Sequence, residues 1–323
     1  MNGGRLPVLE LYCGIGGCAA ALDGAAEVVA AIDIDRRALA IYATNFPRHP
    51  ILARTIEGLT AAELAGFRAD LWWLSPPCQP YTRRGLGRDD QDPRAASLLA
   101  LLDRLQELGP AAPHHLALEN VPAFQGSRCH GRLLDNLGRA GYRHREGLLC
   151  PTELGVPNRR RRYYLVASRD GAPADWSRPL GSAPPPGTLR EYLDDEGDSL
   201  LVDPELVRRY RQALDVVHPD EPGAVSACFT AAYGRSPVRS GSYLALNGSE
   251  GPRIPSGQPR LRRFSPAEVL RLLGFPATYR LPPELPREKA WPLVGNSLSV
   301  PAVRRVLSSL PELASLRPAP DLS

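Results

Sequence analysis

Lysine and long apolar stretches are almost missing from this chain of 323 residues. Lys289 is its only lysine, so arginine carries nearly all of the positive charge, and the net charge is only +4. Arginine suits phosphate groups and base edges, although a GC-rich genome produces the same bias, so the charge hints at an anionic partner without proving one. No apolar run approaches the roughly 18 residues of a membrane-spanning helix. We therefore expect no membrane partner.

Paired cysteines are missing as well. The six cysteines are scattered, form no CxxC pair and follow no N-terminal apolar signal segment: Cys13, Cys18, Cys78, Cys129, Cys150 and Cys228. We therefore expect an intracellular protein in a reducing compartment, cytoplasmic and also nuclear if its source is a eukaryote, without a metal.

Apolar stretches of the β type alternate with helical stretches in the first half of the chain. Residues 7–12, 27–34, 70–74, 115–119 and 162–167 are expected to form strands, and residues 19–22, 36–45, 95–108 and 131–140 helices. This alternation is typical of an α/β protein whose parallel sheet is covered by helices on both faces.

Proline marks a change of organisation after this region. The stretch 171–187, which includes Pro184, Pro185 and Pro186, cannot continue a buried sheet. We expect a first domain at residues 1–170 and a second domain, with its proline-rich linker, at 171–288. Residues 289–323 then return to the first domain, and 293–310 regain an apolar strand or helix pattern.

A glycine-rich turn follows the first expected strand, in the sequence Tyr12-Cys13-Gly14-Ile15-Gly16-Gly17. Glycines let the backbone approach a ligand closely at the carboxyl end of a strand. Asp33 ends the second strand and could accept hydrogen bonds from both hydroxyls of a ribose, and Ile34 could pack against adenine. A plain turn and a helix-capping aspartate would look the same, and the spacing does not choose between NAD and S-adenosylmethionine.

Cys78 stands in the stiff loop Ser75-Pro76-Pro77-Cys78-Gln79-Pro80, directly after an apolar strand. Two adjacent prolines hold the thiol in one orientation at the carboxyl edge of the sheet. A cysteine that only fills a core has no need of a rigid polar turn, so the pattern favours a nucleophile, which requires a lowered thiol pKa.

A carboxyl group and four arginines complete the pattern. Glu119 follows the strand 116–118, and a proton-sharing carboxyl group there could bond both the N3 acceptor and the amino donor of cytosine. In the run from Arg159 to Arg162, alternate residues share a face, so Arg160 and Arg162 are expected to point the same way.

Five motifs occur here in the order that they have in the cytosine-C5 methyltransferases, and the chain resembles this family from about Val8 to Val306. They are the glycine loop, Ser-Pro-Pro-Cys-Gln, Glu-Asn-Val, the Asn-x-Arg-x-Arg block from Asn158, and Leu293-Val294-Gly295-Asn296-Ser297-Leu298. The resemblance implies a Rossmann-like sheet that binds S-adenosylmethionine, which becomes S-adenosylhomocysteine, and a smaller inserted target-recognition domain.

The resemblance also implies roles for particular residues. Cys78 would attack C6 of a flipped cytosine, Glu119 would bond its N3 and amino group, and Arg162, supported by Arg160, would hold its C2 carbonyl. The cofactor contacts would come from Tyr12, Ile15, Gly16, Gly17, Asp33, Ile34, Ile56, Glu57, Ser75, Asn296 and Ser297.

Within the superfamily, the chain is most similar to the methyltransferases that act on tRNA-Asp, which were first classed as DNA enzymes. The likeness lies in Ala53–Gly58, in Pro80–Arg83 and in Cys228-Phe229-Thr230-x-x-Tyr233-Gly234. It implies tRNA, and tRNA-Asp in particular, as partner, with weak DNA binding allowed, and it places Arg83, Cys228, Phe229, Thr230 and Tyr233 near the RNA.

One departure concerns this recognition region: the family's Gly-Thr-Gly-Ser is Arg239-Ser240-Gly241-Ser242 here. Two other classes of function stay open. A DNA cytosine methyltransferase would share every catalytic motif, and a catalytically dead homologue could act as a nucleic-acid-binding module, although the nucleophile, acid and cofactor motifs are all intact.

Overall fold

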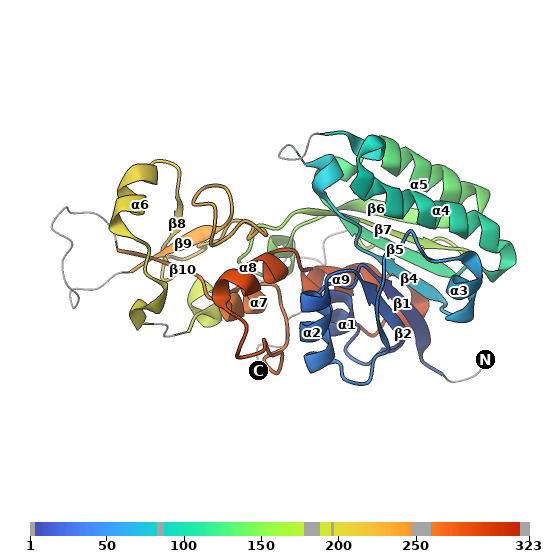
Figure 1. Ribbon diagram of the computed structural model, residues 1–323, viewed down its shortest axis with the longest axis horizontal. Coiled ribbons are helices and arrows are strands. Elements are labelled where there is room, and N and C mark those ends of the chain that lie inside the picture. The colour runs from blue at the N-terminus through green and yellow to red at the C-terminus, as the bar shows by residue number, and fades with distance from the viewer. Residues whose placement is uncertain (1–3, 83–86, 178–187, 195–196, 247–259, 317–323) are drawn as a thin grey trace. The chain divides into compact units, whose positions relative to one another are not determined.

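The chain folds into two compact units (Figure 1). The computed structural model describes residues 4–82, 87–177, 188–194, 197–246 and 260–316. Described residues within Met1–Leu149, Arg161–Gly181 and Val300–Pro318 form the first unit, and those within Cys150–Arg160 and Ser182–Ser299 form the second. Residues 150–160 and 289–299 thus lie in the second unit, and the domain limits drawn from the sequence stay predictions.

A seven-stranded sheet organises the first unit, in the strand order β3-β2-β1-β4-β5-β7-β6. The strands are β1 (Leu6–Leu11), β2 (Ala26–Asp33), β3 (Ile51–Ala53), β4 (Leu71–Leu74), β5 (His115–Asn120), β6 (Arg143–Leu149) and β7 (Arg162–Ser168). Neighbouring strands from β3 to β5 are parallel, whereas β7 is antiparallel to both β5 and β6.

The expected α/β class and five strands are confirmed, but a wholly parallel sheet is wrong. Two parallel neighbouring strands need a crossover connection, usually a helix, between them. No α-helix lies between β6 and β7, so β7 runs antiparallel to β6. Strand β3 was not expected because its apolar run is only three residues long, and strand β6 was not expected because it is half-exposed and begins with Arg-His-Arg-Glu.

Helices cover both faces of this sheet (Figure 1). One face carries α3 (Ala61–Gly66), α4 (Ala96–Leu108) and α5 (Arg128–Arg139), and the other carries α1 (Gly17–Leu22), α2 (Arg36–Asn45) and α9 (Val300–Leu307). Side-chain caps fix where several of them begin. Asp35 accepts a hydrogen bond from Arg37 N at the start of α2, and Thr60 and Glu63 form a reciprocal capping box at α3.

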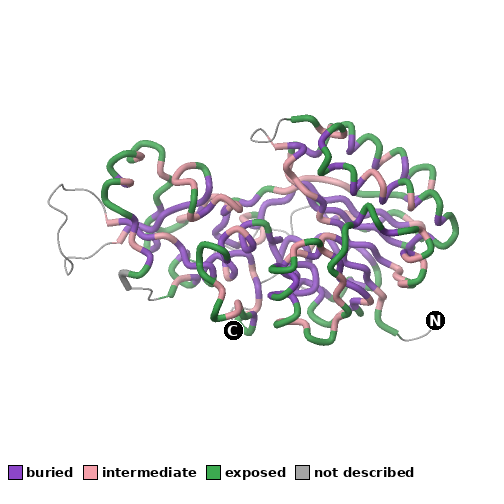
Figure 2. The backbone as a smooth tube through the Cα atoms, viewed as in Figure 1, coloured by how far each residue is buried: buried purple, intermediate pink, exposed green. Residues whose placement is uncertain are grey.

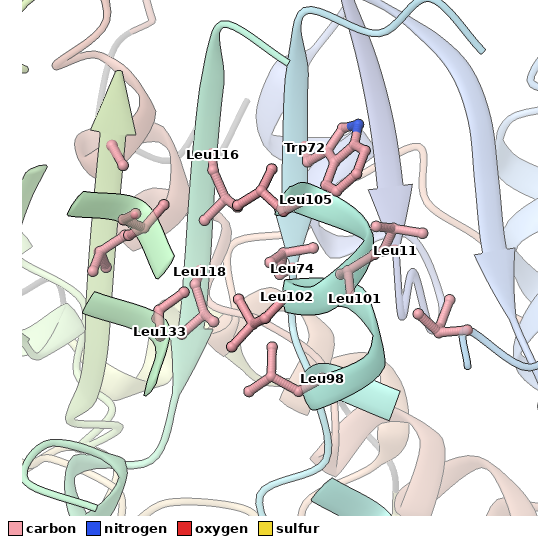
Figure 3. Packing of buried hydrophobic residues seen from close by; sticks show 14 of the residues in the cluster. Leu11, Trp72, Leu74, Leu98, Leu101, Leu102, Leu105, Leu116, Leu118 and Leu133 are labelled. Carbon is pink, nitrogen blue, oxygen red and sulfur yellow. The ribbon is translucent and has the colours of Figure 1, made fainter. Parts of the chain in front are cut away.

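The main core lies between the sheet and α3, α4 and α5. Leu98, Leu101, Leu102 and Leu105 of α4 point toward the sheet, because their spacing places them on one side of the helix (Figure 3). They pack against side chains such as those of Leu74 in β4 and Leu116 and Leu118 in β5. Each fully buried leucine contributes about 1.5–3 kcal/mol. The strands β4 and β5 are buried along their whole length and β7 along nearly all of it, while the outer sides of the helices are exposed (Figure 2).

The second unit is built on a small three-stranded sheet in the order β10-β9-β8. Its elements are α6 (Pro204–Tyr210), β8 (Asp215–Val217), β9 (Ser242–Ala245), β10 (Leu261–Arg263), α7 (Pro266–Leu272) and α8 (Arg287–Gly295). A buried ion pair fixes α7: Glu268 accepts two hydrogen bonds of 2.8 Å from Arg262 and one from Ser265 N. The stretch 293–310, whose type the sequence left open, belongs to the helices α8 and α9.

Two further features bear on the class of protein. Among the helices that the structure describes, none is both long and apolar enough to cross a membrane. Within the same residues, no three or more His, Cys, Asp or Glu side chains are grouped as ligands of a metal ion.

Candidate active site

The glycine loop between β1 and α1 is fastened to the end of β2. Oδ2 of Asp33 accepts a hydrogen bond of 2.8 Å from Gly14 N, and Oδ1 accepts one of 2.8 Å from Asp35 N. Gly14 has a φ of +54°, which favours glycine, and a Cβ built there would meet no atom within 4 Å. The loop backbone therefore borders open space beside the carboxylate.

The surroundings of Asp33 fit a nucleoside. Each carboxylate oxygen keeps a second lone pair that a ribose hydroxyl can use. Next to it, 68% of the Ile34 side chain is exposed, and Ile34 and Val216 are the exposed large hydrophobic residues among those described. An acid and an exposed apolar side chain side by side suit a ribose and an adenine face. These residues of the structure thus fit S-adenosylmethionine.

The other cofactor candidates of the first unit differ in exposure. Ile15, Gly16 and Gly17 are buried, and a Cβ on Gly16 would lie 2.7 Å from Cε2 of Phe46, so this glycine makes room for neighbouring side chains. In the loop after β3, Ile56 is buried and Glu57 is exposed. Only an exposed group can contact a ligand without rearrangement, so Glu57 is the better placed of that pair.

The cysteine loop is held at two points. Ser75 Oγ donates a hydrogen bond of 3.0 Å to Tyr12 O in the glycine loop, and Asn120 Nδ2 donates one of 3.1 Å to Pro76 O. Cys78 is half-buried and directly precedes the 3-10 helix η1 (Gln79–Tyr81). Asn120 was not among the predicted site residues, although its place beside Glu119 in the Glu-Asn-Val motif indicates a role at this edge.

Glu119 and Arg162 meet at the same edge of the sheet. Nε of Arg162 lies 3.3 Å from Oε1 of Glu119, and their side chains are only 15% and 10% exposed. The antiparallel pairing of β5 with β7, in which Glu119 stands opposite Tyr164, brings the two together. A largely desolvated pair of this kind orients both groups.

Arg160 has different surroundings from Arg162. It belongs to the second unit, is 3% exposed, and donates hydrogen bonds of 3.0 Å to Phe229 O and 3.2 Å to Gly295 O. A further hydrogen bond goes to Ser297 O, and Nη1 lies 3.6 Å from Cys228 Sγ. These contacts give Arg160 a supporting role within its unit, and its contact with a base stays a prediction.

The Cys-Phe-Thr element is partly a packing element. Phe229 and Tyr233 are 2% and 1% exposed, and their rings make an edge contact with centroids 4.9 Å apart. Tyr233 also donates to Ser242 O at 2.7 Å. Buried rings cannot touch an RNA chain without rearrangement, so the half-buried Cys228 and Thr230 are better placed to contact RNA.

The remaining candidates divide in the same way. Asn296 is exposed, whereas Ser297 is 7% exposed and is held through its backbone carbonyl by Arg160. Arg83, predicted near the RNA, lies outside the described residues.

A glycine loop, a ribose-type acid and a firmly held cysteine at the carboxyl edge of one sheet define an α/β protein that binds a nucleoside cofactor and carries a candidate nucleophile. Known proteins narrow this class. The profile of the family described as "C-5 cytosine-specific DNA methylase" matches residues 6–201 and 226–312. The chain belongs to this family and is a cytosine-C5 methyltransferase, for which the family implies S-adenosylmethionine as methyl donor.

Relatives match along nearly the whole chain. A Spodoptera frugiperda protein named tRNA (cytosine(38)-C(5))-methyltransferase is 33% identical, over 94% of this chain and 98% of its own length. A Schizosaccharomyces pombe protein of the same name is 35% identical, over 95% and 97%. The crystal structure of S. pombe Dnmt2 methyltransferase superposes with a TM-score of 0.81 at 31% identity, over 94% of this chain and 97% of that one.

Proposed function

We propose that this enzyme methylates C5 of a cytosine in the anticodon loop of tRNA-Asp through a covalent adduct between Cys78 and C6 of the base. The observation that carries the substrate class is the similarity, over 94% of the chain or more, to two proteins named tRNA (cytosine(38)-C(5))-methyltransferase. An anticodon loop presents unstacked bases, so flipping a cytosine there costs less than extracting one from a duplex.

Three side chains of the first unit would carry the chemistry. The Cys78 sulfur forms a bond to C6, while Glu119 shares a proton with N3, and C5 gains the electron density that it needs to accept a methyl group. Arg162 holds the C2 carbonyl oxygen. Loss of the C5 proton to a base then restores the ring double bond and expels the Cys78 thiolate. Nε of Arg162 lies 3.3 Å from Oε1 of Glu119, and this closeness suits two groups that bind N3 and the C2 carbonyl oxygen, which are neighbours on one base.

S-adenosylmethionine would supply the methyl group. Asp33 would bind its ribose, Ile34 would pack against its adenine, and the backbone around Gly14 would lie alongside it. The open space at Gly14 and the exposure of Ile34 support this assignment. Asn296 and Ser297 stay predicted cofactor contacts.

A DNA cytosine methyltransferase is the alternative, because the family description names DNA and the catalytic motifs serve both substrates. Radiolabelled methyl transfer to total tRNA and to duplex DNA, run in parallel, separates the two. We expect label in tRNA with wild type and none with Cys78→Ala. Equal or faster labelling of duplex DNA, with unlabelled tRNA, would replace the proposal by the DNA enzyme.

The adduct has its own test. A tRNA that carries a cytosine with fluorine at C5 cannot lose a proton there, so the Cys78–C6 bond should persist in wild type as a species of reduced mobility on a denaturing gel. Cys78→Ala should give no such species, and wild type without it would contradict the covalent step.

A further inference from the structure

A charged turn lies beside the cysteine loop in the first unit. The 3-10 helices η2 (Asp89–Gln91) and η3 (Pro93–Ala95) contact each other, and both contact η1, which starts directly after Cys78. Tyr81 N donates a hydrogen bond of 3.0 Å to Cys78 O and closes this first turn. The turn that carries the nucleophile thus packs against η3.

Arg94 of η3 is fixed by Asp92. Its Nε donates to Asp92 Oδ1 at 2.9 Å, its Nη2 donates to Oδ2 at 2.7 Å, and its backbone N donates to Oδ1 at 3.0 Å. The Asp92 side chain is 3% exposed and that of Arg94 is 48% exposed. Two parallel hydrogen bonds hold a guanidinium in one plane, so the positive charge has a defined place at the surface of this turn.

The helix that follows adds to this arrangement. η3 leads into α4, and Leu98 in the first turn of α4 lies at the end of the sheet where β4 and β5 finish, while Leu105 lies toward the opposite end, near Trp72 and Leu116 (Figure 3). The N-terminus of α4 therefore lies at the carboxyl edge that also carries Cys78. The positive end of the helix dipole favours negative charge there.

The charges of Arg94 and Cys78 act on each other. The pKa of the Arg94 guanidinium is raised mainly by its hydrogen bonds to Asp92, and the negative charge of a Cys78 thiolate adds to this effect. Attraction between two charges is mutual, so Arg94 must favour the thiolate in return. Other titratable or charged groups on the elements around this turn and at the neighbouring strand end are Tyr81, Arg88, Asp89, Asp90, Asp92, Glu119, Arg128, Cys129 and Arg162.

We propose that Arg94, oriented by Asp92, is a positioning residue that stabilises the thiolate form of Cys78. The inference deepens the proposed function and rests on it, because only a nucleophilic Cys78 benefits from a standing positive charge. Thiolates next to arginine and near helix N-termini form at lower pH than free cysteine does.

The pH dependence of Cys78 alkylation by iodoacetamide in the full chain tests this role. Tryptic peptide 69–83 contains Cys78 as its only cysteine, and peptide 212–235 contains Cys228, so mass spectrometry follows both in one sample. In Arg94→Gln the midpoint for Cys78 should rise by roughly half a pH unit or more, while Arg94→Lys, which keeps the charge, should stay near wild type. The midpoint for Cys228 should not move.

Arg104→Gln is the matched control, because Arg104 on α4 is also paired with a carboxylate, that of Glu107. If Arg94→Gln does not fold, as judged by circular dichroism, Arg94→Met replaces it. A Cys78 midpoint that is the same in wild type and in the folded, uncharged variant would overturn the inference. Alkylation needs neither cofactor nor RNA. An unchanged midpoint would therefore contradict the role of Arg94 alone, and methyl transfer to tRNA is tested by its own assay.

Discussion

Nε of Arg162 lies 3.3 Å from Oε1 of Glu119, and neither side chain is more than 15% exposed. The two groups come from antiparallel neighbours, and the hydrogen bond from Asn120 Nδ2 to Pro76 O fastens the cysteine loop to the same strand end. Acid, arginine and nucleophile loop are therefore tied to one rigid edge before any substrate arrives, which is the condition for efficient chemistry on a bound base.

Glu119→Gln should lower kcat by about a hundredfold or more, because an amide cannot share a proton with N3 of the base. Affinity for S-adenosylhomocysteine should stay unchanged, since the residues assigned to the cofactor are others. Steady-state methyl transfer and titration calorimetry measure the two quantities. Glu107→Gln, on the exposed side of α4, is the control, and wild-type turnover by Glu119→Gln would refute the acid's role.

Asp33→Asn should weaken binding of S-adenosylhomocysteine by about one to two decades, since hydrogen bonds to a charged group contribute roughly 1.5–3 kcal/mol. The loss of affinity has two sources. One is the hydrogen bonds from the carboxylate to the ribose, and the other is its hydrogen bonds from Gly14 N and Asp35 N, which hold the glycine loop. Calorimetry on this variant and on Asp135→Asn, an exposed position of α5, gives the comparison. Equal affinities in the two variants would remove Asp33 from the cofactor site.

Glu10 makes stability depend on pH. Burial raises the pKa of this fully buried carboxyl group to about 8, although Tyr42 donates a hydrogen bond of 2.8 Å to it. The folded pKa is above the unfolded one, so the folded state loses stability as pH rises from about 4.5 to about 8, by at most about 1.4 kcal/mol per pH unit.

Glu10→Gln cannot ionise and should escape this decline. Urea unfolding at several pH values in that window should therefore show wild type losing stability relative to Glu10→Gln as pH rises. Parallel pH profiles of the two proteins would contradict the buried, protonated carboxyl group.

Arg239 has a φ of +55°, which lies in the left-handed region that favours glycine. The left-handed region is strained for arginine, so Arg239→Gly should stabilise the protein by roughly 1 kcal/mol. Arg235→Gly, in the same loop but without a positive φ, should instead be neutral or destabilising. A urea midpoint that rises only for Arg239→Gly is expected, and a fall for it would contradict the strain.

Much of this architecture could be predicted from the sequence, because apolar periodicity is a local signal. Helix α2 was predicted with its observed limits, and the α/β class followed from the alternation of expected strands and helices in the first half of the chain. The reversal of β7 could not be predicted, because pairing between distant strands leaves no mark on either one. The different surroundings of Arg160 and Arg162 were equally hidden, since alternation along a strand does not reveal that the chain passes from one unit to the other between them.

Bisulfite sequencing of a tRNA pool incubated with enzyme and S-adenosylmethionine tests the central claim most directly. We predict one protected cytosine in the anticodon loop of tRNA-Asp with wild type, and none with Cys78→Ala. Protection that survives in Cys78→Ala, or a wild-type pool without any protected anticodon-loop cytosine while duplex DNA becomes methylated, would contradict the account.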